Sequence, residues 1–259
     1  IKNNSAEKIK FRAGIKIKGL MDDYSKTPSW TEVPPNGFVQ VKIPVIIPHS
    51  RSSVNENFNS QGEIMIEFNY GSKEYQIKET KKVRVYGSRF LTWDDPSKLA
   101  SFVNPTDSTI MKFAKVLVNE ELSVSYWESV NPSVKSAGLI YSGLQLYGLK
   151  YSKDPNVPDI SKQSDQLDYI QFPGETFTYK SGDCDDLVVL FASCLESMGI
   201  HTAFISVPGH IFLAFDSNIS DSDFEQVTLN KNSVILADGK VWIPLELTLI
   251  GTHDFLTSW

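Results

Sequence analysis

The sequence predicts an α+β protein in two parts: a small antiparallel β-sandwich over residues 1–92, then a domain of helices and antiparallel strands over residues 93–259. The spacing of apolar residues along the chain predicts this division into two parts. Apolar and polar residues alternate along the first ninety residues, as in half-buried strands, whereas from Asn104 apolar residues recur at helical spacing. Residues 203–207 and 211–215 then look like neighbouring strands joined by a tight Pro-Gly turn, so further strands should follow the helices.

Short alternating runs joined by turns make up the first part. One run covers residues 39–45 and another residues 64–70, and the sequence Pro-Pro-Asn-Gly at 34–37 supplies a turn before the first. Several such strands are typical of a small antiparallel sandwich. Lysines alternate with apolar residues here, which is typical of a solvent-facing strand face. We expect an accessory module that packs beside, or presents substrate to, the second part; the alternative is an independent binding domain.

Two helices and a loop should open the second part. The first helix should begin near Pro105, with Thr106 or Ser108 as its cap. The residues spaced for one helical face are Ile110, Phe113, Ala114 and Leu117, then Val134, Ala137, Tyr141 and Leu144. Residues 150–166 are polar and contain prolines, so we expect a surface loop.

Cys184 should stand at the start of a third, buried helix. It lies in the run Gly-Asp-Cys-Asp-Asp at 182–186, and Gly199 should end the helix. The apolar stripe of this helix is Leu187, Leu190, Phe191, Cys194, Leu195 and Met198. A thiol at a helix N-terminus is next to unpaired N–H groups and the positive dipole end, which favour a thiolate and supply oxyanion donors. Neighbouring aspartates would oppose this unless they point away, and Asp185 and Asp186 are equally typical of dipole-compensating residues.

The second cysteine should be a buried hydrophobic residue. Cys194 lies ten residues after Cys184, about 15 Å along a helix. A disulfide tolerates about 7 Å between Cα atoms, so both cysteines should be free thiols.

His210 is the expected base, and Glu246 the residue that orients it. His210 follows a Pro-Gly turn between strands expected over 203–207 and 211–215, and a cysteine nucleophile needs a base within reach. Asp216 is on the same strand about 20 Å away, and Asp238 is better explained as the first residue of an Asp-Gly hairpin turn. Glu246 is a carboxylate in an otherwise apolar strand, a costly arrangement without a partner.

These segments resemble the transglutaminase-like superfamily, including the bacterial transglutaminase-like cysteine proteinases. The matching pieces lie between residues 168 and 259: Gly182–Asp186, Ser197–Ile200, Pro208–His210 and Trp242–Thr248. The resemblance implies a papain-like fold, with the cysteine helix packed on an antiparallel sheet and a triad of Cys184, His210 and Glu246. The family usually has aspartate where this chain has Glu246, and its upstream oxyanion donor is not obvious here; Gln171 is the candidate.

The resemblance implies thiol-dependent acyl transfer or amide hydrolysis on peptide or protein substrates, as in a cysteine peptidase, amidase or transglutaminase. The alternative is an inactive module of the same fold that binds peptides or proteins. A redox switch is a third class, disfavoured because Cys194 should be buried and out of reach of Cys184.

Composition limits the partners and cofactors. With 41% hydrophobic and 22% charged residues the chain should fold, and a net charge of -6 argues against nucleic-acid or anionic-membrane partners. No apolar run reaches the roughly 18 residues of a membrane span. We expect no cofactor and no metal, because neither His49, His201 nor His210 has a zinc-type set of neighbours. The start at Ile1 and the accessory β part favour an extracytoplasmic location.

Overall fold

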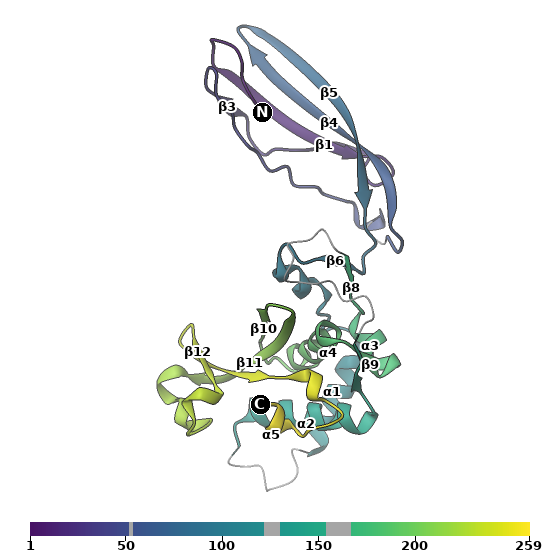
Figure 1. Cartoon of the computed structure of the whole chain (residues 1–259), viewed down its shortest axis with the longest axis vertical. Helices are drawn as coiled ribbons and strands as arrows, with labels where there is room; N and C mark the ends of the chain where they lie inside the picture. Colours follow the sequence, from purple (N-terminus) through teal and green to yellow (C-terminus); the bar gives the residue numbers. More distant parts are fainter. Residues whose placement is uncertain (52–53, 122–129, 154–166) are drawn as a thin grey trace. The chain divides into compact units, whose positions relative to one another are not determined.

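A computed structural model describes residues 1–51, 54–121, 130–153 and 167–259, and divides the chain into two compact units (Figure 1). Unit 1 is Ile1–Ser88 and unit 2 is Arg89–Trp259. The boundary lies four residues before the expected one because β6 (Phe90–Thr92) pairs with β8 (Leu167–Tyr169) of unit 2. The mixed α+β class with antiparallel sheets is confirmed.

Unit 1 is built on one antiparallel sheet. Its strands follow the order β2-β1-β4-β5, and β3 pairs with the same edge of β1 as β2 does. Their bounds are β1 (Ile9–Ile17), β2 (Ser25–Lys26), β3 (Thr31–Val33), β4 (Phe58–Tyr70) and β5 (Lys73–Val85). One face carries the alternating apolar residues, since Phe11 pairs with Phe68 and Ala13 with Ile66.

The expected sandwich lacks its second sheet in the part of unit 1 that the structure describes. Val39, Val41 and Ile43 pack as half-buried side chains on the small core around Phe11, but the segment forms no strand. Pro44 and Pro48 bracket its end, and proline has no N–H to donate to a ladder. The alternation therefore correctly indicated one-sided packing, while the backbone covers the sheet without pairing as a second one.

The described helices of unit 2 are α1 (Ser108–Glu121), α2 (Pro132–Tyr147), α3 (Pro173–Tyr179), α4 (Cys184–Ser197) and the short α5 (Phe255–Ser258). Three of them, α1, α2 and α5, begin after a polar side chain that accepts from their first N–H groups. The α1 cap is Asp107, whose Oδ1 accepts from Thr109 and Ile110, rather than Thr106 or Ser108. Asn131 caps α2 through Ser133 and Val134. The sequence analysis did not anticipate α3.

Four antiparallel strands form the main sheet of unit 2, in the order β10-β11-β13-β12. Their bounds are β10 (Thr202–Val207), β11 (His210–Ser220), β12 (Ile235–Ala237) and β13 (Lys240–Leu245). The β12–β13 turn has Asp238 at φ 53° and Gly239 at φ 72°, the left-handed pair of a type I′ hairpin. Buried residues of α1, α2, α4, β11 and β13 belong to one hydrophobic cluster.

The expected loop over 150–166 is described only in part. Residues 150 and 151 form the short strand β7 (Lys150–Tyr151), and 154–166 lie outside the described residues. In the portion of the chain that the structure covers, no helix is long and apolar enough to cross a membrane.

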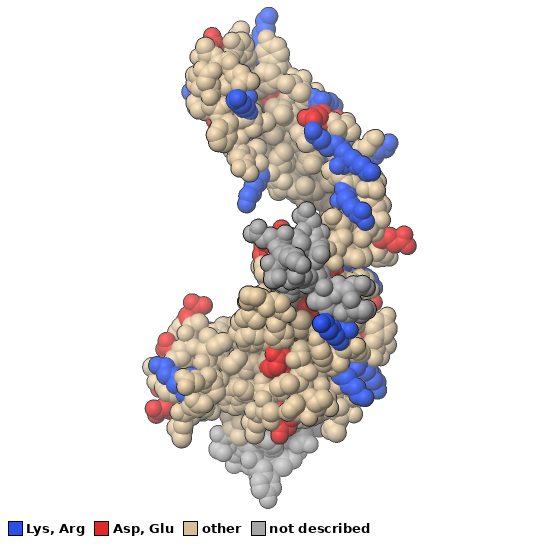
Figure 2. All heavy atoms as spheres, viewed as in Figure 1, with Lys and Arg blue, Asp and Glu red and all other residues tan. Residues whose placement is uncertain are grey.

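The two units carry opposite charge. Residues 1–88 contain 14 Lys and Arg against 9 Asp and Glu, whereas residues 89–259 contain 11 against 22. Figure 2 shows the Lys and Arg side chains along the surface of unit 1. The net charge of -6 is therefore the sum of a basic unit and a strongly acidic one.

Candidate active site

Helix α4 presents Cys184 at its first residue. Asp183, in extended conformation with φ -87° and ψ -162°, is the N-cap, and the short strand β9 (Ser181–Gly182) leads into it. Cys184 is partly exposed, whereas residues 185–195 are all buried. The apolar body of the helix thus anchors it in the core, and the thiol at its first residue is partly exposed between two buried aspartates, Asp183 and Asp185. Cys184 and Cys194 are both free thiols, as expected.

His210 and Glu246 form a direct pair. His210 Nε2 lies 2.6 Å from Glu246 Oε2, and both side chains are about one-third exposed, at 33% and 29%. Glu246 lies one residue past β13, not within it as expected, and its Oε1 accepts from the Thr248 N–H at 2.9 Å and Oγ1 at 2.6 Å. Burial would raise the pKa of the Glu246 carboxyl, but the hydrogen bonds from Thr248 and His210 outweigh it and hold this pKa below its usual value.

The other two acids considered for this role lie elsewhere. Asp216 Oδ2 is 2.5 Å from Lys240 Nζ, and its Oδ1 accepts from the Asn218 N–H. Asp238 occupies the turn between β12 and β13. The assignment of Glu246 by elimination therefore agrees with the contacts that the structure contains.

The thiol of Cys184 faces the start of β11. The backbone amide of Ile211, the residue after His210, lowers its pKa, but burial first and the Asp183 carboxylate second prevail and raise the pKa to about 11. The structure has no hydrogen bond between Cys184 and His210, two residues that it fully describes. The resting thiol is therefore un-ionised at neutral pH, and a base would have to remove its proton during attack.

Gln171 lies against the first turn of the same helix. Its Nε2 donates to Asp186 Oδ2 and its backbone N–H donates to Asp186 Oδ1, both at 2.7 Å. The side-chain amide nitrogen of Gln171 carries a second hydrogen, which the contact with Asp186 does not use. The Asp186 contact, which the sequence analysis did not anticipate, fixes Gln171 beside the residue two positions after Cys184.

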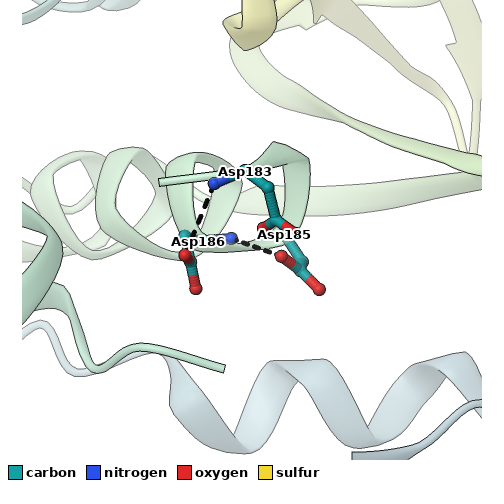
Figure 3. Close-up of side chains that lie close together, drawn as sticks. All are labelled: Asp183, Asp185 and Asp186. Carbon is teal, nitrogen blue, oxygen red and sulfur yellow. Dashed lines mark hydrogen bonds between the residues drawn. The ribbon is translucent and has the colours of Figure 1, made fainter. Parts of the chain in front are cut away.

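Four carboxyl groups are buried beneath this turn. Asp168, Asp183, Asp185 and Asp186 are 5%, 7%, 2% and 4% exposed. Figure 3 shows three of them on α4, with the Asp183 N–H directed at Asp186 and the Asp186 N–H donating to Asp185 Oδ1 at 2.9 Å. Burial, followed by a hydrogen bond with the Asp183 side chain and then by neighbouring charges, raises the pKa of Asp185 well above normal, and burial raises the pKa of Asp186 to about 7.

Asp185 and Asp186 stand in the first turn of α4, as the dipole-compensating interpretation expects, but they are buried rather than exposed to solvent. Asp183, Asp185 and Asp186 each offer an oxygen within 4.8 Å of the others, and they are the group among the described residues whose spacing could hold a metal ion. Carboxylate oxygens suit hard cations such as Ca²⁺ or Mg²⁺. A cluster of acids does not by itself establish such a site, and no chemical step below depends on one.

No family model, curated protein or solved structure matches this chain.

Gly182 is a close-packed point of the site, and we predict that Gly182→Ala disturbs it. An added Cβ would lie 2.6 Å from Asp186 Cβ and 3.1 Å from Thr176 Cγ2. Relief requires α3 and α4 to separate, so we expect a loss of about 1–3 kcal/mol in the free energy of unfolding. Urea denaturation checks this, with Gly199→Ala as a comparison in which nothing lies within 4 Å of the new Cβ and only the φ of 77° is strained. If Gly182→Ala proved as stable as wild type, that result would contradict the close packing of Gly182 against Asp186 and Thr176.

Proposed function

We propose that unit 2 carries out thiol-dependent acyl transfer or amide hydrolysis on peptide or protein substrates, with Cys184 as nucleophile, His210 as base and Glu246 as the residue that orients the base. The observation that carries this proposal is the 2.6 Å contact between His210 Nε2 and an ionised Glu246, beside a thiol at a helix N-terminus. The partly exposed thiol is directed at the strand that His210 opens.

The roles of the two imidazole nitrogens follow from this contact. Because Nε2 is engaged by Glu246, Nδ1 is the nitrogen left to accept the thiol proton. As Cys184 Sγ bonds to the carbonyl carbon, the proton passes to Nδ1 and Glu246 stabilises the resulting imidazolium. The imidazolium then protonates the departing amine as the C–N bond breaks, leaving a thioester on Cys184. Water or a second amine attacks the thioester and regenerates the thiol.

The oxyanion formed in the tetrahedral intermediate needs donors near Cys184. Backbone N–H groups of the first turn of α4 are preorganised donors for this oxyanion, and they lie at the positive end of the helix dipole. Gln171 is the proposed side-chain donor, because Asp186 holds its amide nitrogen while leaving one N–H. Hydrolysis is the default reaction, since transfer to an amine requires additional structure that excludes water.

The proposed architecture is papain-like and transglutaminase-like: a cysteine helix against an antiparallel sheet. In support, Leu187, Leu190 and Phe191 of α4 share one hydrophobic cluster with Leu213, Phe215 and Ile243 of the sheet. The order of nucleophile, base and acid along the chain, from helix to following strand to the next strand's end, also supports the resemblance.

The test is site-resolved labelling of the native protein by iodoacetamide, with mass spectrometry. We expect modification at Cys184 and none at Cys194, which is 0% exposed. Cys184→Ala should abolish native labelling while its unfolding transition stays within about 1 kcal/mol of wild type. Labelling of the native Cys184→Ala variant as fast as wild type would overturn the assignment of the nucleophile. Unfolded wild-type protein, labelled at both cysteines, is the positive control.

The alternative is an inactive module of the same fold that binds peptides or proteins. Two observations favour it: the absence of a hydrogen bond between the described side chains of Cys184 and His210, and a thiol pKa raised to about 11. Active cysteine enzymes often tighten such contacts only when substrate binds. A binding module should show Cys184 alkylation that does not depend on His210, whereas an enzyme should show strong dependence.

A further inference from the structure

Tyr151 is held beside the cysteine-bearing turn by backbone pairing. It is the second residue of β7, which pairs in parallel with β9, and its register partner is Gly182. The Lys150 N–H donates to the Lys180 carbonyl at 3.0 Å, and the Ser152 N–H donates to the Gly182 carbonyl at 2.9 Å. Gly182 is two residues before Cys184, so the ladder fixes the position of Tyr151 relative to the thiol.

The turn that follows Glu246 packs against the same strand. The 3-10 turn η6 (Leu247–Leu249), which begins immediately after Glu246, contacts β7. A Cβ built on Gly251 would lie 3.0 Å from the Leu149 carbonyl oxygen, which shows how closely this turn approaches. Strand β7 therefore lies between the turn that carries the nucleophile and the turn that carries the acid.

The phenol of Tyr151 is partly open to solvent and lies within the electric field of the site. The residue is 40% exposed, too open for a core tyrosine. Burial first, then the charges of Cys184, Asp183 and Glu246, raise the pKa of its hydroxyl. The hydroxyl is therefore protonated throughout the neutral range and available as a hydrogen-bond donor.

We propose that Tyr151 is a substrate-contacting residue: its ring forms one wall of the acyl-binding site beside Cys184, and its hydroxyl donates to an amide carbonyl of the bound peptide. The inference rests on the proposed function and assigns its substrate class to peptide segments that run alongside β7. An aromatic ring with a polar tip provides apolar contact area to a peptide together with one directional hydrogen bond. A small thiol-reactive reagent, unlike a peptide, should reach Cys184 without contacting the Tyr151 ring.

The experiment compares two reagents on wild type, Tyr151→Phe and Tyr151→Ala. Iodoacetamide reports the thiol alone, and a peptidyl chloromethyl ketone reports the thiol and the peptide-binding wall. We expect iodoacetamide rates to stay within about twofold in both variants. For the peptidyl reagent we expect the concentration at half-saturation to rise about tenfold in Tyr151→Ala, the effect of about 1.4 kcal/mol. Tyr151→Phe, which loses only the hydroxyl, should rise about threefold.

The control variant is Tyr70→Ala, because Tyr70 is also 40% exposed and is the last residue of β4, which carries none of the proposed site residues. Unchanged half-saturation in Tyr151→Ala, an equal loss with both reagents, or a wild type that does not saturate with the peptidyl reagent would each overturn the proposal. Failure of the proposed function is a separate result: iodoacetamide labelling of Cys184 would then be indifferent to His210, whichever residue occupies position 151.

Discussion

Replacing His210 by alanine is expected to slow alkylation of Cys184 by about a hundredfold or more at pH 7.5, the usual contribution of a general base. Burial and Asp183 raise the thiol pKa to about 11, so very little thiolate exists at this pH without a proton acceptor. The imidazole supplies that acceptor, and Glu246 compensates the charge that it gains. The measurement is the pH dependence of the iodoacetamide rate, followed at Cys184 by mass spectrometry.

The shape of the two profiles makes the result specific. Wild type should react through the neutral range, whereas His210→Ala should react only as the pH approaches 11, where the two rates converge. His253→Ala is the matched control, since the His253 side chain is exposed and its hydrogen bond among the described residues joins Nδ1 to Oγ1 of its neighbour Thr252. Equal alkylation rates for wild type and His210→Ala across this pH range would show that His210 does not activate the Cys184 thiol. That result would favour the inactive binding module.

The pairing of His210 with Glu246 illustrates what local sequence patterns can predict. The Pro-Gly turn placed His210 at a strand start, the Asp-Gly turn explained Asp238, and strand length kept Asp216 away from the imidazole; each of these features is present in the structure. Such features depend on a few neighbouring residues. Glu246 also caps a 3-10 turn, because its side chain accepts from the Thr248 N–H. This contact depends on the residue at which β13 ends, and the apolar pattern defines that boundary only to within a residue or two.

The second sheet of unit 1 was wrongly expected for a related reason. Alternation reports which side chains are half-buried, and it did so correctly at Val39, Val41 and Ile43. It does not report whether backbone groups have partners, and Pro44 removes one donor from that run. Composition was similarly incomplete, since a net charge of -6 concealed a basic unit 1.

The buried acids were the largest surprise at the site. Asp183, Asp185 and Asp186 look like an ordinary charged helix start, and only the tertiary structure shows that Gln171 and Asp168 pack against them. A periodicity argument treats each aspartate as a surface residue because nothing local signals burial. The arrangement has a thermodynamic consequence that can be measured.

Asp185→Asn is expected to raise the stability of unit 2 at pH 8. Burial raises the folded-state pKa values of Asp185 and Asp186 above the unfolded value of 3.8, to about 7 for Asp186. Between these pH values the folded state binds more protons than the unfolded state, so stability is full below about pH 4 and is lost as the pH rises through about 7. For Asp186 alone the shift corresponds to about 4 kcal/mol.

Asparagine at position 185 mimics the protonated acid, because its Oδ1 can still accept from the Asp186 N–H and its amide can donate toward Asp183. We therefore expect urea denaturation, in buffer with EDTA so that no divalent cation competes with protons, to show a gain of at least about 1 kcal/mol over wild type at pH 8 and a smaller difference at pH 4.5. Asp223→Asn, at an exposed position, should show neither. A variant less stable than wild type at pH 8 would mean that Asp185 is ionised and favourably partnered in the folded protein. In that case Asp183 and Asp185 would form a stabilised cluster of negative charge next to Cys184. This negative charge would oppose formation of the Cys184 thiolate more strongly than Asp183 alone does, and any reactivity of the thiol would have to overcome it.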